Sequence, residues 1–129
     1  MKDIIIGKEY SCAYVVQEHD LANRVGSGEV AVFATPMMIA RMEQCASTLL
    51  KEFLEDEETS VGAMIHTTHD APTPCGMRVE INAQIIEVKG KRISFAITAK
   101  DERHTIGTAH HERVVVDKGR FEAKATGLN

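Results

Sequence analysis

One acidic side chain, Glu43, interrupts an apolar pattern in the first half of the chain. Between Met38 and Leu54, apolar residues recur at three- and four-residue steps, which is typical of one buried helix face. At about 100° per residue, Glu43 falls between Leu50 and Leu54 on that face. A carboxylate at such a position must be paired, protonated or used in chemistry. The pattern therefore favours a catalytic carboxylate on a central helix over the alternative, a solvated glutamate at the rim of the stripe.

His69 is the second residue whose type and position suggest chemistry. It ends a predicted strand immediately before Asp70-Ala71-Pro72-Thr73-Pro74, where a loop can hold the ring beside a cleft. A histidine with a pKa near neutrality and a buried carboxylate close by can act as a general base. The competing interpretation is a strand-end histidine in water, because only geometry makes such a residue a base.

Thr35 is followed by Pro36, which together indicate the start of a helix. The threonine hydroxyl can cap an unpaired backbone N–H, and proline suits the first helical position because it lacks that donor. Eight residues separate Thr35 from Glu43, which corresponds to about 12 Å along a helix. The two side chains of one chain therefore cannot hydrogen-bond directly. Either a substrate spans the distance, or a second subunit supplies one of the groups.

The six histidines do not predict a metal site. His66 and His69 are three residues apart on a predicted strand, so their side chains point to opposite faces. His110 and His111 are adjacent and diverge in the same way. His66, His104 and His111 are interpreted as surface or sheet-edge residues, and no metal or cofactor is expected. Motifs of serine hydrolases, nucleotide hydrolases and metalloproteases are absent from the sequence.

Composition limits the class of protein. A chain of 129 residues, 43% hydrophobic and with a formal charge of −4, predicts one soluble domain over residues 1–129. No run of Lys or Arg exceeds two residues, which disfavours nucleic-acid binding. The apolar run within Met1–Gly7 is too short for a signal peptide or membrane span, so a cytoplasmic location is expected. Cys12, Cys45 and Cys75 form no closely spaced pair, which fits a reducing compartment.

Periodicity predicts the elements that position these residues. A strand at about 8–16 and a loop over 19–31 precede a long helix over roughly 36–55. Alternation of period two then predicts four strands, at about 61–69, 79–85, 93–99 and 105–116. In the first of these, Gly62 falls on the opposite face from Ile65 and His69.

This order predicts an α+β fold in which a five-stranded antiparallel sheet wraps one long central helix. A single curled sheet leaves such a helix incompletely covered. We therefore expect at least a homodimer, and whether dimers pair into tetramers stays open.

Several short segments match a known family of enzymes in their order and spacing. These segments are Val32-Phe33-Ala34-Thr35, Met42-Glu43, Gly62, Thr68-His69 with Thr73-Pro74, and His111-Glu112-Arg113. With them the chain resembles the hot-dog fold thioesterases, and within that superfamily it most resembles the fluoroacetyl-CoA thioesterase group. The match runs from Phe33 to about Val116, which covers the helix and the four later strands.

The resemblance implies a catalytic set of Thr35, Glu43 and His69. In that family the glutamate acts as nucleophile or as base on water, the histidine assists proton transfer, and the threonine helps to hold the thioester. Gly62 and Arg113 fall at substrate-contacting positions, which implies a backbone N–H and a guanidinium near the acyl carbonyl. The alternatives are a plain strand glycine for Gly62 and a solvated strand charge for Arg113.

One departure from the family concerns specificity. The fluoroacetyl-specific enzyme has phenylalanines in a lid ahead of its catalytic threonine, whereas the corresponding stretch here is Gly26-Ser27-Gly28-Glu29. We therefore expect an acyl-CoA thioesterase for small or medium acyl groups, and not fluoroacetyl-CoA as its specific substrate. The alternative is a non-catalytic module that binds an acyl-CoA or acyl carrier. A hot-dog dehydratase is disfavoured because its Asp/His loop-and-helix motif is not intact in the sequence.

Overall fold

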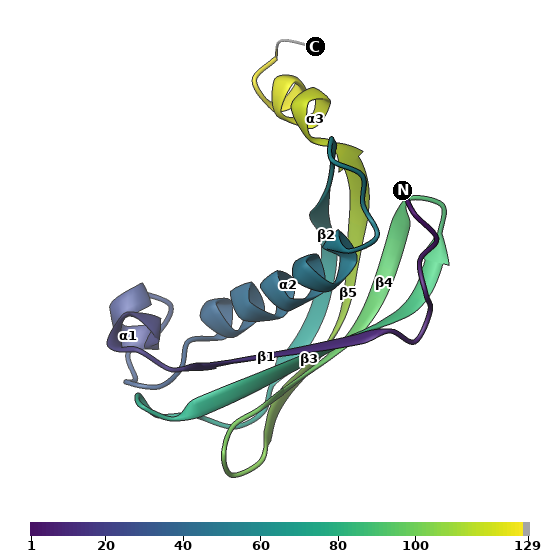
Figure 1. Ribbon diagram of the computed structural model, residues 1–129. Coiled ribbons are helices and arrows are strands. Elements are labelled where there is room, and N and C mark those ends of the chain that lie inside the picture. Colours follow the sequence, from purple (N-terminus) through teal and green to yellow (C-terminus); the bar gives the residue numbers. More distant parts are fainter. Residues whose placement is uncertain (128–129) are drawn as a thin grey trace.

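Five strands form one antiparallel sheet that curves around a single long helix (Figure 1). The computed structural model describes residues 1–127, and the spatial order of the strands is β1-β3-β4-β5-β2. The strands are β1 (Glu9–Val15), β2 (Glu58–His69), β3 (Arg78–Lys89), β4 (Arg92–Lys100) and β5 (Thr105–Asp117). Every neighbouring pair is antiparallel. The predicted α+β architecture is confirmed.

The central helix, α2 (Thr35–Lys51), ends four residues before the predicted boundary of 55. Phe53 and Leu54 continue the apolar pattern and are buried in the core, although they lie beyond the end of the helix. Two short elements, η1 (Glu18–Asp20) and α1 (Ala22–Val25), precede α2. No helix within residues 1–127 is long and apolar enough to cross a membrane.

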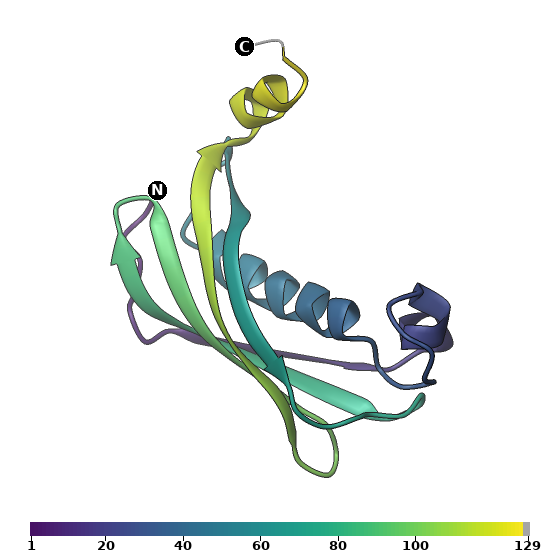
Figure 2. The same cartoon turned by 180° about the vertical axis from the view of Figure 1, so that it is seen from behind.

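A third helix, α3 (Lys118–Ala125), was not predicted from the sequence. It has no buried residue, so it lacks the apolar stripe on which helix prediction depends. Asp117 caps it by accepting a hydrogen bond from the Arg120 backbone N–H at 2.9 Å. Figure 2 shows α3 beyond the end of β5, away from α2.

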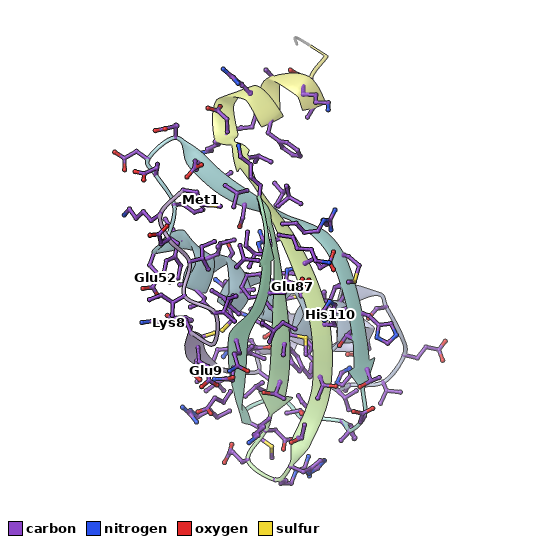
Figure 3. The ribbon with its side chains drawn as sticks, turned by 90° about the vertical axis from the view of Figure 1, so that its right-hand side faces the viewer. Met1, Lys8, Glu9, Glu52, Glu87 and His110 are labelled. Carbon is purple, nitrogen blue, oxygen red and sulfur yellow. The ribbon has the colours of Figure 1, made fainter. Side chains whose placement is uncertain are left out.

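The core lies between α2 and the concave face of the sheet. The buried helix residues are Met38, Met42, Cys45, Ala46, Leu49 and Leu50. The strands contribute mainly aliphatic side chains at alternating positions, such as Val79, Ile81, Ala83 and Ile85 on β3. Figure 3 faces the opposite side of the sheet, where the labelled Glu87 and His110 are exposed. One side of the sheet therefore packs on the helix, and the other carries polar side chains.

A β-bulge in β2 changes which residues of that strand face the helix. The pairing with β5 shifts register between Gly62 and Met64. Because a bulge inserts one extra residue, here Ala63, the alternation reverses across it. Gly62 consequently faces Glu43 on α2, and Ile65, beyond the bulge, also packs against the core. The prediction that Gly62 and Ile65 lie on opposite faces was wrong for this reason.

Candidate active site

A short hydrogen bond joins Thr35, at the start of α2, to His69, at the end of β2. The Thr35 Oγ1 lies 2.7 Å from Nδ1 of His69. Thr35 is not the helix cap that the sequence suggested, because Ala34 occupies the N-cap position and no side chain makes a capping bond. The hydroxyl is instead engaged with the imidazole, which is 34 residues away in sequence.

His69 is held in a partly buried setting. The ring of Phe33 contacts it edge-on, with ring centroids 6.3 Å apart. Burial lowers the pKa of His69, and the negative charge of Asp70 opposes that effect. The imidazole is therefore neutral at pH 7 and can accept a proton. Its Nε2 is buried and has no hydrogen-bond partner among residues 1–127.

The Thr35–His69 pair lies in a cleft of about 290 Å³. One wall comes from α1 and the segment that follows it, including Ala22, Ser27 and Val32. Asp70, Ala71 and Pro72, in the loop after β2, also line it. The expectation that a loop holds His69 beside a cleft is thus confirmed.

Glu43 lies two turns further along α2, in a second cluster of polar groups. Its Oε2 is 3.8 Å from Nη1 of Arg113, and its side chain is 41% exposed while that of Arg113 is only 9% exposed. Gly62 adjoins the same carboxylate: a Cβ built on this glycine would lie 2.6 Å from Oε2 of Glu43. Glu43 is therefore neither buried nor fully solvated, and it pairs with a buried guanidinium on β5, the strand next to the edge strand β2.

Arg113 is fixed by hydrogen bonds and is not the solvated charge that was the alternative interpretation. Its Nε donates to Oγ of Ser60 at 2.8 Å, and its Nη2 donates to the Ser60 carbonyl at 3.0 Å. Burial lowers the pKa of the guanidinium and the Glu43 carboxylate raises it. An arginine stays protonated in proteins, so Arg113 presents a fixed positive charge to Glu43.

His111 is buried, and the prediction that it lies at the surface was wrong. It is 1% exposed, and its Nε2 lies 3.2 Å from Nη1 of Arg113. Because a guanidinium only donates, Nε2 is the acceptor and the ring hydrogen is on Nδ1, which donates to the Met64 carbonyl at 2.8 Å. Burial lowers the pKa of His111, in agreement with a neutral ring. Strand alternation could have revealed it, because His111 and Arg113 share one face of β5.

The predicted site residues thus fall into two groups within one chain. Thr35 and His69 meet at the cleft, whereas Glu43 meets Gly62 and Arg113. No direct hydrogen bond connects the two groups in the described part of the chain, as the spacing of Thr35 and Glu43 along the helix requires. The first group can exchange a proton with a bound molecule, and the second can present a carboxylate beside a fixed cation.

Comparison with known proteins gives one consistent result. A family model described as fluoroacetyl-CoA-specific thioesterase, FlK, matches residues 16–119. A relative from Streptantibioticus cattleyicolor named fluoroacetyl-CoA thioesterase is 35% identical over 131 residues, covering 96% of this chain and 94% of its own. A solved structure of the fluoroacetyl-CoA thioesterase FlK has a TM-score of 0.93 and 30% identity over 99% of both chains. A Thermus thermophilus hypothetical protein described as a thioesterase superfamily member has a TM-score of 0.91 and 29% identity, covering 99% of this chain and 95% of its own.

Proposed function

This chain belongs to the fluoroacetyl-CoA-specific thioesterase family and has the hot-dog fold, and we propose that it hydrolyses a small or medium acyl-CoA thioester. The observation that carries the proposal is the hydrogen bond of 2.7 Å between Thr35 and His69 in the cleft. A binding module would have no use for a neutral imidazole held there against a hydroxyl. The alternative, a non-catalytic acyl-CoA or acyl-carrier-binding module, is therefore less well supported.

In the proposed reaction, Glu43 attacks the thioester carbonyl carbon or removes a proton from an attacking water. The bond between this carbon and sulfur breaks. If Glu43 attacks, the acyl group is left on Glu43 as a mixed anhydride, which a water then hydrolyses. In either route the proton that the water loses reaches the coenzyme A thiolate through His69, which is neutral at rest and accepts it. Thr35 orients the thioester and the imidazole. Because about 12 Å along α2 separates Thr35 from Glu43 of the same chain, either the substrate spans that distance or the second subunit of a homodimer supplies one of the groups. The net result is that one water is consumed and a carboxylic acid and a free thiol are released.

Gly62 and Arg113 are proposed to contact the substrate near the same carbonyl. Arg113 brings a fixed positive charge, and Gly62 brings a backbone with no side chain in front of it. Both properties suit the negative charge that develops on the carbonyl oxygen in acyl transfer. The contact of each with Glu43 supports a shared role.

Fluoroacetyl-CoA is not proposed as the specific substrate. The segment ahead of Thr35 carries Gly26-Ser27-Gly28-Glu29, and Ser27 lines the cleft where the resemblance leads us to expect an aromatic lid. Without that lid, residues 26–29 bring no aromatic side chain to the cleft that could favour a fluorinated acyl group. A panel of acyl groups is therefore the appropriate way to identify the substrate.

We also propose that the protein is a homodimer formed through β2. This strand is the edge of the sheet, and it runs for 12 residues with an exposed Met64. A long unpaired edge of this kind invites pairing with another strand. Pairing with a second copy would also cover the exposed part of Glu43, which lies beside β2. Light scattering coupled to size exclusion measures the mass directly, and a monomer at all concentrations would contradict this proposal.

The test of the activity is release of free thiol from a panel of acyl-CoAs, with wild type measured beside Glu43→Gln. We expect turnover of at least one acyl-CoA and a loss of about a hundredfold or more in the mutant, the scale expected for a catalytic acid or base. No turnover by a folded protein would favour the binding module. If the mutation left turnover unchanged, the protein would still be a hydrolase, but Glu43 would have no role in its mechanism.

A further inference from the structure

A hollow next to the C-terminal helix has a chemistry that the proposed reaction does not use. It has a volume of about 280 Å³ and lies between α3, the end of β5 and the turn that joins β3 to β4. Arg120, Phe121 and Lys124 line it from α3, where Lys124 follows Arg120 by four residues and Phe121 by three, so that it neighbours both on the helix surface. Lys91 lines it from the turn. Phe121 is 42% exposed, so an aromatic surface is available there.

The charge of the hollow differs from that of the chain as a whole. The chain carries a formal charge of −4, yet Lys91, Arg120 and Lys124 gather around this one depression. Asp117, the only acid among the described residues that line it, accepts the capping hydrogen bond from the Arg120 backbone N–H. None of the three cations forms an ion pair with another side chain within residues 1–127. The hollow therefore offers positive charge to a ligand.

The hollow is joined to the candidate active site through β5. Val115 lines the hollow and follows Arg113 by two residues on the same buried face of that strand. Its backbone N–H donates to the Lys91 carbonyl at 2.8 Å, which holds the β3–β4 turn against β5. From Arg113 to Asp117 the strand advances about 13 Å. A molecule that reacts beside Arg113 and has a long extension could therefore reach the hollow.

We propose that this hollow binds the phosphorylated adenosine end of the coenzyme A substrate. The proposal rests on the proposed acyl-CoA hydrolysis. Phe121 provides a face on which the adenine ring stacks, and Arg120, Lys124 and Lys91 contact the phosphate groups. Arg120 can grip a phosphate with two N–H groups, whereas the lysines act as point charges. A second copy of the chain would bring the same three cations against each other, which makes it a poor occupant.

The test compares two substrates with the same acyl group. One is the acyl-CoA, and the other is the acyl thioester of N-acetylcysteamine, which lacks the nucleotide. In the double variant Arg120→Gln/Lys124→Gln, and separately in Phe121→Leu, we expect KM for the acyl-CoA to rise about tenfold or more with kcat unchanged. The kinetics on the truncated thioester should stay those of wild type.

The matched control removes two exposed positive charges elsewhere on the surface, in the variant Lys8→Gln/Lys100→Gln. It loses the same net charge, and the labelled Lys8 lies away from α3 in Figure 3. We expect KM for the acyl-CoA to stay within about twofold of wild type. If KM rose equally in this control, general electrostatic attraction would explain the effect of Arg120→Gln/Lys124→Gln. That result would overturn the proposal of a specific binding site in the hollow.

A direct measurement keeps the test independent of turnover. Adenosine 3′,5′-bisphosphate, which carries the base and phosphates without the thioester, is titrated into the intact protein by calorimetry. Binding by wild type and about tenfold weaker binding by Arg120→Gln/Lys124→Gln would support the hollow even if no thioester is hydrolysed. Equal affinity in both proteins, or an unchanged KM for the acyl-CoA in the variants, would overturn the proposal. Thermal melting of each variant checks that it is folded.

Discussion

A Cβ added at Gly62 would lie 2.6 Å from Oε2 of Glu43, closer than real Cβ atoms approach a neighbour. The carboxylate therefore rests directly against the backbone of β2, at the bulge that turns Gly62 towards the helix. This contact explains why glycine fits at the position even though glycine weakens a strand.

Gly62→Ala should displace the Glu43 carboxylate and leave the fold largely intact. The obstructing atom is the end of a flexible side chain, so the carboxylate can move aside at little cost in stability. A displacement of about 1 Å at a catalytic group lowers turnover by up to about a hundredfold. We expect kcat to fall at least tenfold with little change in Tm. Unchanged kcat in the purified variant would argue against a catalytic position for Glu43.

Gly107→Ala should damage both stability and activity. A Cβ there would lie 2.5 Å from the Thr68 carbonyl and 2.9 Å from Sδ of Met38. Because the first of these atoms is backbone, the end of β2 must move, and with it His69, which pairs with Gly107. We expect a loss of about 1–3 kcal/mol in the free energy of unfolding, the usual cost of overpacking, together with lower kcat.

The matched control for Gly107 is Gly119→Ala on α3. There a Cβ would lie 3.7 Å from its nearest neighbour, an ordinary contact. Urea unfolding should show this variant to be as stable as wild type or slightly more stable, since alanine favours helix. If Gly107→Ala behaved like Gly119→Ala, the close packing between β5, β2 and α2 would not be what sets the position of His69.

Two substitutions at Thr35 distinguish the effect of its hydroxyl from the effect of its branched shape. Thr35→Val keeps the branched side chain and removes the hydrogen bond to His69, whereas Thr35→Ser keeps the hydroxyl. We expect kcat/KM to fall about tenfold or more in Thr35→Val, the scale of one hydrogen bond, and to fall much less in Thr35→Ser. Equal losses in the two variants would show that the methyl group matters and the hydroxyl does not.

The pH dependence of turnover should report His69. The neutral imidazole is the form that accepts a proton, and burial lowers its pKa below the usual 6.5. Activity should therefore hold steady as the pH falls through 6.5 and decline only at lower pH, where His69 becomes protonated. In His69→Gln, we expect kcat/KM to drop about a hundredfold or more and the limb assigned to the imidazole to disappear. An identical profile in wild type and variant would assign the titration to another group.

Stability should also fall at mildly acidic pH because of His111. Its pKa is lowered in the folded protein, so the unfolded chain binds a proton at about pH 6.5 while the folded chain does not. The free energy of unfolding is therefore fully maintained above pH 6.5, and it decreases as the pH falls towards the lower pKa of the folded state. Urea unfolding at pH 7.5 and pH 5.5 should show a smaller decrease in the free energy of unfolding for His111→Gln than for wild type, while the partly buried His69 contributes equally to both.

Several features of the fold follow from local patterns. The apolar repeat from Met38 to Leu50 predicts α2, and alternation predicts the strands that become β2 to β5. Helix α3 escaped prediction because it is short, polar and without a buried face. The sequence pattern predicts a helix end at 55, beyond the observed end at Lys51, because Phe53 and Leu54 continue the apolar periodicity after the helical backbone has ended.

The sequence identified the residues of the candidate site more completely than the contacts between them. The sequence pattern indicates Thr35, Glu43 and His69 as candidates for chemistry. The same pattern, however, predicts that Thr35 caps a helix and that His111 lies at the surface. In the structure the Thr35 hydroxyl forms a hydrogen bond with His69, and His111 is buried against Arg113. Both corrections involve partners that no local pattern connects.

The sequence by itself determined the central helix with its apolar face, the five strands and the residue types available for chemistry, because these depend on neighbours within a few positions along the chain. Only the tertiary structure decided which polar groups meet. A single extra residue, Ala63, reverses the alternation of β2 and brings Gly62 to Glu43. Strand register likewise sets His69 opposite Gly107, and thereby within reach of Thr35. Register and bulges arise from packing between distant segments, which is why they emerge only when the chain is folded.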